Sequence, residues 1–181
     1  MWIFGYGSLM WRPDFPYEKK IYGSIKGFSR KFWQQSIIYR GTPAHPGRCV
    51  TIVAEEGAVS YGVAYKISQD KQEEVRQKLD AREKRLYQKT VDFQPRCLDD
   101  QEETIKALVY YGDETNVGFH PASDEEIAKV IVSSRGLGGT NIDYLLNLTS
   151  YLREHFPEDD DKHLFTLEKL VLNLRNEGIK C

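Results

Sequence analysis

The sequence contains few cysteines, and no two of them are close together. Cys49, Cys97 and Cys181 are widely spaced, odd in number and lack a Cys-x-x-Cys pair. A disulfide framework typically uses an even set of cysteines, and a zinc site uses closely spaced ones. The pattern is typical of free thiols in a reducing compartment.

An excess of positive charge is also missing. The chain has 25 Lys and Arg against 27 Asp and Glu, for a formal net charge of −2. A nucleic acid or a membrane surface that is bound through a basic face is therefore not an expected partner. The first apolar stretch, residues 2–10, is too short for a secretory signal, and no later run could span a bilayer. We expect a soluble, cytoplasmic protein.

Motifs for metals and common cofactors are absent as well. The four histidines show no metal-ligand spacing, so we predict no metal site. The turn Gly5–Ser8 lacks the Gly-x-Gly-x-x-Gly spacing of a dinucleotide loop, and Ser8 lacks the Gly-x-Ser-x-Gly elbow of a hydrolase. We predict no cofactor.

What is present is concentrated at the start of the chain. The run Trp2–Phe4 predicts a short buried strand, and it ends at once in Gly5-Tyr6-Gly7-Ser8. Such a turn is either plain punctuation between elements or a place where backbone N–H groups converge on an anionic oxygen.

The first two thirds of the chain predict strands. We expect them at residues 21–28, 31–36, 49–54, 60–67, 87–93 and 105–111, with a hairpin turn at Glu55–Gly57 and an exposed hairpin end over 95–103. One helix interrupts them, over residues 70–81. Asp70 and Glu73 have the spacing of a capping box at its start.

The last third predicts helices. Ser123 and Glu126 form a second capping box, Asn141 is expected to cap a helix that runs through Leu152, and a final helix covers about 161–174. The acidic run Glu158–Asp161 is interpreted as a solvated helix entrance. Strands that come first and helices that gather late indicate an α+β fold, and 181 residues suit a single domain over 1–181.

Several ordered motifs are similar to those of one family. They are Phe4–Leu9, Arg40–Arg48, Tyr61–Tyr65 and Leu79–Glu83, with weaker matches at Leu108–Tyr110 and Asn141–Leu146. The sequence resembles the γ-glutamylcyclotransferases, and in particular their ChaC-type, glutathione-degrading branch. The resemblance implies a small mixed β-barrel with surrounding helices, and an intramolecular lyase reaction that releases 5-oxoproline and cysteinyl-glycine from glutathione.

The resemblance also implies roles for individual residues. Glu83 matches the catalytic acid/base, although a glutamate among basic neighbours is otherwise an ordinary surface charge. Its neighbouring arginines would lower the pKa of Glu83 and burial would raise it, and the sequence leaves the balance open. The matching substrate-binding residues are Tyr6, Gly7, Ser8, Leu9, Tyr87, Tyr110 and Arg40.

Three departures from the family pattern put the leaving-group preference in question. Arg85-Leu86 replaces a glycine pair, Val117–Pro121 replaces a Leu-Gly-Pro segment, and Gly136–Gly139 replaces a Gly-Pro-Ser-Gly turn. Other γ-glutamyl amino acids or amines are therefore alternative substrates, and a non-catalytic γ-glutamyl-binding protein is a third possibility. The number of subunits is left open.

Overall fold

The computed structural model describes residues 1–83, 86–96 and 104–178. The chain divides into two compact units. The first unit comprises Met1–Ser29 and Ile52–Asn116, and the second unit comprises Arg30–Thr51 and Val117–Cys181. In the described part of the chain, no helix is long and apolar enough to cross a membrane.

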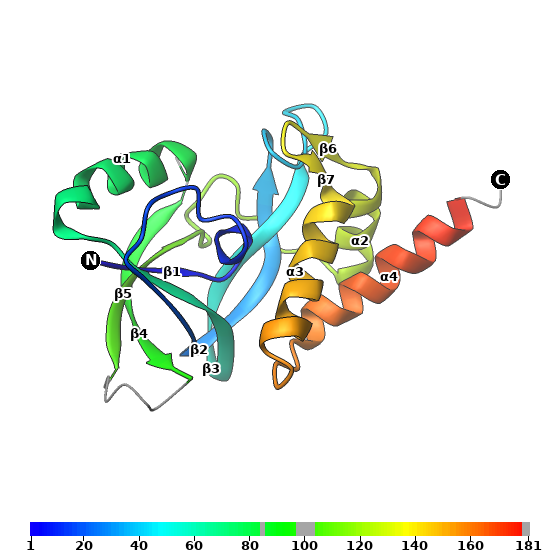
Figure 1. Cartoon of the computed structure of the whole chain (residues 1–181). Coiled ribbons are helices and arrows are strands. Elements are labelled where there is room, and N and C mark those ends of the chain that lie inside the picture. Colours follow the sequence, from blue (N-terminus) through cyan, green and yellow to red (C-terminus); the bar gives the residue numbers. More distant parts are fainter. Residues whose placement is uncertain (84–85, 97–103, 179–181) are drawn as a thin grey trace. The chain divides into compact units, whose positions relative to one another are not determined.

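Five strands form a closed barrel in the order β1-β3-β2-β4-β5 (Figure 1). They are β1 (Trp2–Gly5), β2 (Lys19–Ser36), β3 (Gly47–Lys66), β4 (Tyr87–Pro95) and β5 (Ile105–Tyr111). β1 pairs antiparallel with β3 and parallel with β5, so the barrel is mixed. The first unit holds β1, β4, β5 and parts of β2 and β3, packed around an apolar interior. Fully buried members include Ile3, Phe4, Ile25, Val63, Tyr65, Phe93, Ala107 and Val109.

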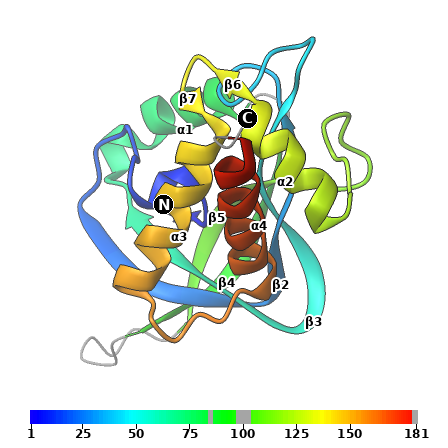
Figure 2. The same ribbon diagram turned by 90° about the vertical axis from the view of Figure 1, so that its right-hand side faces the viewer.

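The helices comprise α1 (Gln72–Arg82), which follows the short 3-10 turn η2 (Gln69–Lys71), and three later helices. These are α2 (Asp124–Ser133), α3 (Asn141–His155) and α4 (Lys162–Gly178), which lie together in the second unit (Figure 2). Their apolar faces meet through buried side chains that recur at helical spacing. These include Ile127, Ile131, Leu145, Leu148, Leu152, Leu164, Leu167 and Val171. The predicted α+β class and mixed barrel are confirmed.

The strand boundaries differ from the prediction in two places. Residues 21–28 and 31–36 belong to one strand, β2, and the expected hairpin turn at Glu55–Gly57 is wrong because β3 runs through it without a break. Gly57 has φ +78°, which only glycine adopts at low cost, so the strand changes direction without turning back.

Two of the expected helix caps are also wrong. Asp70 lies inside the 3-10 turn η2, and Lys71 is the N-cap of α1 without a side-chain bond. Thr140, not Asn141, caps α3 by accepting a bond from the backbone N–H of Asp143. The capping box of Ser123 and Glu126 is confirmed in both of its bonds.

The acidic run before α4 is only partly solvated. The side chains of Asp159 and Asp161 are 4% and 11% exposed, and both lie near the buried guanidinium of Arg30. The Arg30 Nη1 atom donates to Asp161 Oδ2 at 2.7 Å. The run 158–161 therefore supplies two buried partners of an arginine, which corrects the expectation of a solvated helix entrance.

Candidate active site

The loop after β1 is a tight turn. A side chain at Gly5 would place its Cβ atom 2.7 Å from the Cβ atom of Leu9, so only glycine fits there. Ser8–Met10 form a 3-10 turn, η1, whose first backbone bond runs from Met10 N to Gly7 O at 2.9 Å. The N–H groups of Ser8 and Leu9 precede that bond and have no acceptor within the turn.

Two buried tyrosines hold this loop in place. The hydroxyl of Tyr6 donates to the carbonyl of Tyr110 at 2.7 Å, which ties the loop to β5. The hydroxyl of Tyr65, on β3, donates to the carbonyls of Leu9 and Met10 at 2.8 and 3.0 Å. Because both hydroxyls are satisfied by the backbone, Tyr6 and Tyr65 fix the conformation of the loop. The sequence predicted no role for Tyr65, because its partners Leu9 and Met10 lie more than 50 positions away in the chain.

Glu83 follows the last residue of α1. Its backbone N–H donates to Leu79 O at 2.7 Å, and its carbonyl accepts from Leu86 N at 2.7 Å, so the chain turns sharply at this residue. Its side chain is 22% exposed. Burial raises the pKa of Glu83, and the positive charge of Arg82 offsets part of that rise. Burial therefore prevails, which answers the question that the sequence left open.

Arg82 connects Glu83 to the loop. Its Nε atom lies 3.3 Å from Glu83 Oε1, and its Nη2 atom donates to the hydroxyl oxygen of Ser8 at 2.7 Å. Sequence reasoning treated Arg82 only as a charge that would lower the pKa of Glu83. Its contact with Ser8 joins residues 74 positions apart, so no local pattern could have predicted it.

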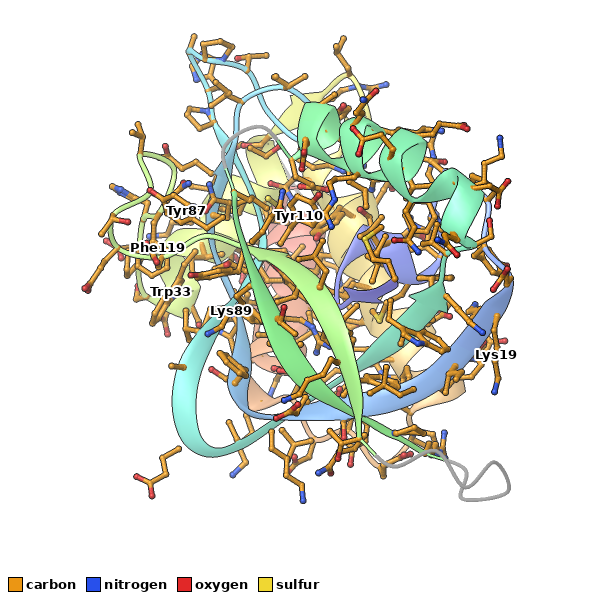
Figure 3. All side chains as sticks on the ribbon, turned by 90° about the vertical axis from the view of Figure 1, so that its left-hand side faces the viewer. Lys19, Trp33, Tyr87, Lys89, Tyr110 and Phe119 are labelled. Atoms are coloured by element: carbon orange, nitrogen blue, oxygen red, sulfur yellow. The ribbon has the colours of Figure 1, made fainter. Side chains whose placement is uncertain are left out.

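Tyr110 lies beside α1 (Figure 3). Its hydroxyl donates to Asp80 Oδ1 at 2.7 Å, and the side-chain amide of Gln88 donates to the same oxygen at 2.5 Å. Burial, the bond to Asp80 and the nearby charge of Glu83 all raise the pKa of Tyr110. Tyr110 is thus a neutral phenol close to Glu83. The Asp80 carboxylate holds its hydroxyl and also accepts a hydrogen bond from Gln88 on β4.

Two of the predicted substrate-binding residues have protein partners of their own. Tyr87 is 42% exposed on β4, and its hydroxyl exchanges hydrogen bonds with Thr115 (Figure 3). Arg40 belongs to the second unit, where its guanidinium donates to the carbonyls of Gly138 and Thr140 and lies over the Tyr144 ring. Within the first unit, the structure connects Tyr6, Gly7, Ser8, Leu9, Tyr110 and Glu83, and the substrate contacts of Tyr87 and Arg40 stay predictions.

The departures from the family pattern have separate outcomes. Arg85 lies outside the described residues. Gly136–Gly139 forms the turn of a small hairpin between β6 (Arg135–Gly136) and β7 (Gly139–Thr140) in the second unit. Phe119, from the departure at Val117–Pro121, makes an isolated β-bridge to Gln34 on β2.

Across residues 1–83, 86–96 and 104–178, no group of three or more His, Cys, Asp or Glu side chains could hold a metal ion.

Comparison with known families shows to which family the chain belongs. The profile of the "ChaC-like protein" family matches residues 1–174. The chain belongs to the ChaC-like family. A relative from Danio rerio, "Glutathione-specific gamma-glutamylcyclotransferase 1", is 40% identical over an alignment of 176 residues that covers 95% of this chain and 89% of the relative. "Gamma-glutamylcyclotransferase 2-3" from Arabidopsis thaliana is 39% identical over 186 residues, covering 98% and 92% of the two chains.

The fold of this ChaC-like chain is similar to that of a solved relative. The crystal structure of a yeast γ-glutamylcyclotransferase specific to glutathione superposes with a TM-score of 0.84 at 30% identity, covering 97% of this chain and 99% of that one. A second structure, titled "Gamma-glutamyl cyclotransferase", has a TM-score of 0.54 at 12% identity, which shows a shared fold.

Proposed function

We infer that this chain is a γ-glutamylcyclotransferase that cleaves glutathione to 5-oxoproline and cysteinyl-glycine. The family match, the named relatives and the loop with its adjacent carboxyl group support this assignment. The single observation that carries the proposed mechanism is the position of Glu83. It is a largely buried carboxyl group with a raised pKa, connected through Arg82 to the loop at Ser8.

The reaction needs one proton carrier and no covalent enzyme intermediate. The α-amino group of the γ-glutamyl unit attacks its own γ-carbonyl carbon, which forms the ring C–N bond, and the amide C–N bond to cysteine then breaks. Glu83 accepts the proton that the α-ammonium group loses and delivers it to the departing amine. A carboxyl group whose pKa is raised toward neutrality is suited to both transfers. Arranging the substrate for ring closure supplies further rate enhancement.

The loop is proposed to stabilise the oxyanion. A tetrahedral intermediate carries negative charge on the former carbonyl oxygen, and preorganised N–H donors stabilise such a charge. The N–H groups of Ser8 and Leu9 at the start of the 3-10 turn are the proposed donors. The neutral hydroxyl of Tyr110 is proposed to border the γ-glutamyl pocket, and Tyr87 and Arg40 are kept as proposed contacts for the rest of the substrate.

The remaining sequence-based expectations belong to the same proposal. We propose that the chain acts as one domain, which a family match that covers residues 1–174, and so parts of both units, supports. A cytoplasmic site of action fits the substrate, because glutathione keeps thiols reduced in the cytosol. No nucleic acid and no membrane are proposed as partners.

The test is turnover of reduced glutathione by the purified protein, with 5-oxoproline and cysteinyl-glycine quantified. The wild type should release the two products in equal amounts. Glu83→Gln should lower kcat/KM by at least about 100-fold, as expected for the loss of a general acid/base. Glu74→Gln is the matched control, because Glu74 is an exposed glutamate on the same helix, α1.

Three results would contradict the assignment or its mechanism. Equal activity of wild type and Glu83→Gln would place the proton carrier elsewhere. Absence of product from glutathione, with product from other γ-glutamyl amino acids or amines, would keep the reaction and change the substrate. Binding of these compounds without any turnover would favour a non-catalytic protein.

A further inference from the structure

Arg82 is the most connected side chain of the candidate site. All three nitrogens of its guanidinium have partners: Nε lies 3.3 Å from Glu83 Oε1, Nη2 donates to Ser8 Oγ at 2.7 Å, and Nη1 lies 3.1 Å from Asp14 Oδ2. Nη1 also donates to the carbonyl of Arg12 at 3.3 Å. The side chain is only 20% exposed. A guanidinium that is engaged on every nitrogen is arranged to hold protein groups rather than to bind a substrate carboxylate.

The partner at Asp14 has a strained backbone. Asp14 is the one non-glycine residue with positive φ among those that the structure describes, with φ 56°. Such a conformation is uncommon outside glycine and persists when surrounding contacts determine it. Two arginines provide those contacts, Arg82 through Nη1 and Arg12 through Nε at 3.3 Å from Oδ1. Arg82 therefore holds the segment that follows the loop as well as the loop itself.

The partners of Arg82 come from distant parts of the chain. Ser8 precedes it by 74 positions and Asp14 by 68, whereas Glu83 is its immediate neighbour. One side chain thus connects the proposed oxyanion-binding loop with the proposed proton carrier. A change in the position of Arg82 would move both.

We propose that Arg82 is the positioning residue of this site, which holds the loop through its bond to Ser8 and holds Glu83 through its adjacent positive charge, both in their working geometry. This inference rests on the proposed function for its kinetic consequences. Its structural content, the coupling of Arg82 to Glu83, holds whatever the substrate is.

The two roles of Arg82 are separated by two variants. Arg82→Ala removes both the charge and the contacts. The pKa of Glu83 then rises further, because the offsetting positive charge is lost, and the acidic limb of the pH profile of kcat/KM moves to higher pH. Arg82→Lys keeps a charge but lacks the planar fork that reaches Ser8 and Asp14 together. It should leave the acidic limb in place and still lower kcat/KM, by on the order of 100-fold if the loop is displaced by about 1 Å.

Lys78→Ala is the control, because Lys78 is an exposed cation on α1 with no described contact to the site. Its pH profile and kcat/KM should equal those of the wild type. Thermal melting of each variant establishes that it is folded, and Arg82→Gln replaces Arg82→Ala if the alanine variant does not fold.

A measurement without turnover keeps this inference separate from the proposed function. Carbon-13 labelling of glutamate side chains gives the titration midpoint of Glu83 by NMR, with its resonance assigned from Glu83→Gln. The midpoint should rise in Arg82→Ala and stay unchanged in Lys78→Ala and Arg82→Lys. An unchanged midpoint in Arg82→Ala would overturn the inference even if glutathione is cleaved. A raised midpoint in a protein that cleaves no γ-glutamyl compound would support it and defeat the proposed function.

Discussion

Two glutamates of this molecule lie beside an arginine, and their pKa values shift in opposite directions. In the second unit, Glu168 accepts from both Nη atoms of Arg153 and from the hydroxyl of Thr149 at 2.6 Å, and these bonds lower its pKa. In the first unit, Glu83 faces Arg82 only through a 3.3 Å contact, and burial raises its pKa.

The difference teaches that the number of hydrogen bonds, and not the presence of an opposite charge, decides the state of a partly buried carboxyl group. Glu168 is satisfied and stabilises the packing of α4 on α3. Glu83 is largely removed from water without equivalent donors, which costs stability and is characteristic of functional groups. The comparison therefore supports the proposed role of Glu83 as the proton carrier.

The largest expected effect is an opposite outcome in two variants: Glu168→Gln should lose stability and keep activity, and Glu83→Gln should lose activity and keep stability. Glu168→Gln should lower the free energy of unfolding by about 1–2 kcal/mol, because charge-assisted hydrogen bonds to Arg153 and Thr149 are weakened. Its kcat/KM should equal the wild-type value. Glu83→Gln should abolish most activity without loss of stability. Urea denaturation at pH 7 together with the turnover assay measures both, and a stability loss in Glu83→Gln that matches that of Glu168→Gln would remove the contrast.

A smaller effect should appear in the pH dependence of stability around Glu83. The pKa of Glu83 is higher in the folded protein than its ordinary value of 4.5, so the unfolded chain ionises first. The stability associated with the protonated group is fully present below pH 4.5 and is lost as pH rises through the folded pKa. Glu83→Gln, which cannot ionise, should therefore equal the wild type at pH 4 and exceed it in stability at pH 8. Denaturation curves at the two pH values test this, and a gap that narrows with rising pH would contradict it.

The smallest effect concerns His163, at the start of α4 in the second unit. Its Nε2 atom accepts from the Phe32 backbone N–H at 2.9 Å, its Nδ1 atom lies 2.8 Å from Asp124, and burial lowers its pKa. Stability from the neutral ring is complete above its unfolded pKa, about 6.5, and decreases as pH falls below it. The carboxylates of Asp124 and Asp161 offset part of this loss, and Lys31 adds to it.

The His163 effect is measured by comparing the wild type with His163→Gln between pH 7.5 and 5.5. The wild type should lose stability on acidification and the variant should lose less. Equal losses would assign the acid sensitivity to another group. Ionisation of Glu83 thus lowers the free energy of unfolding as pH rises, and protonation of His163 lowers it as pH falls.

Some predictions that rest on local chemistry agree with the structure, whereas the caps expected at Asp70 and Asn141 do not. The capping box of Ser123 and Glu126 forms because both partners lie within one turn of helix. The strand 105–111 follows from its hydrophobic pattern alone. For the candidate site, the family resemblance predicted Glu83 and the loop at Tyr6–Leu9, and both stay proposals.

Predictions failed where distant residues decide the outcome. The acidic run at 158–161 looks solvated until Arg30, more than 120 positions earlier, is placed against it. The turn signal at Glu55–Gly57 was overridden because β3 continues through these residues as a strand of the barrel, between β1 and β2. The role of Arg82 was hidden for the same reason, since Ser8 and Asp14 meet it only through the fold.

The interleaving of the two units along the chain has a consequence for synthesis. Residues 30–51 of the second unit interrupt the first unit, which needs residues up to Asn116 to be complete. The second unit in turn needs helices that begin only at Asp124. Neither unit can therefore complete its folding while only an early segment of the chain has left the ribosome. The barrel forms only after strands that are far apart in sequence have all been synthesised. Loop closure over such separations slows folding, so the newly made chain should depend on protection of β2 and β3 until its last third emerges.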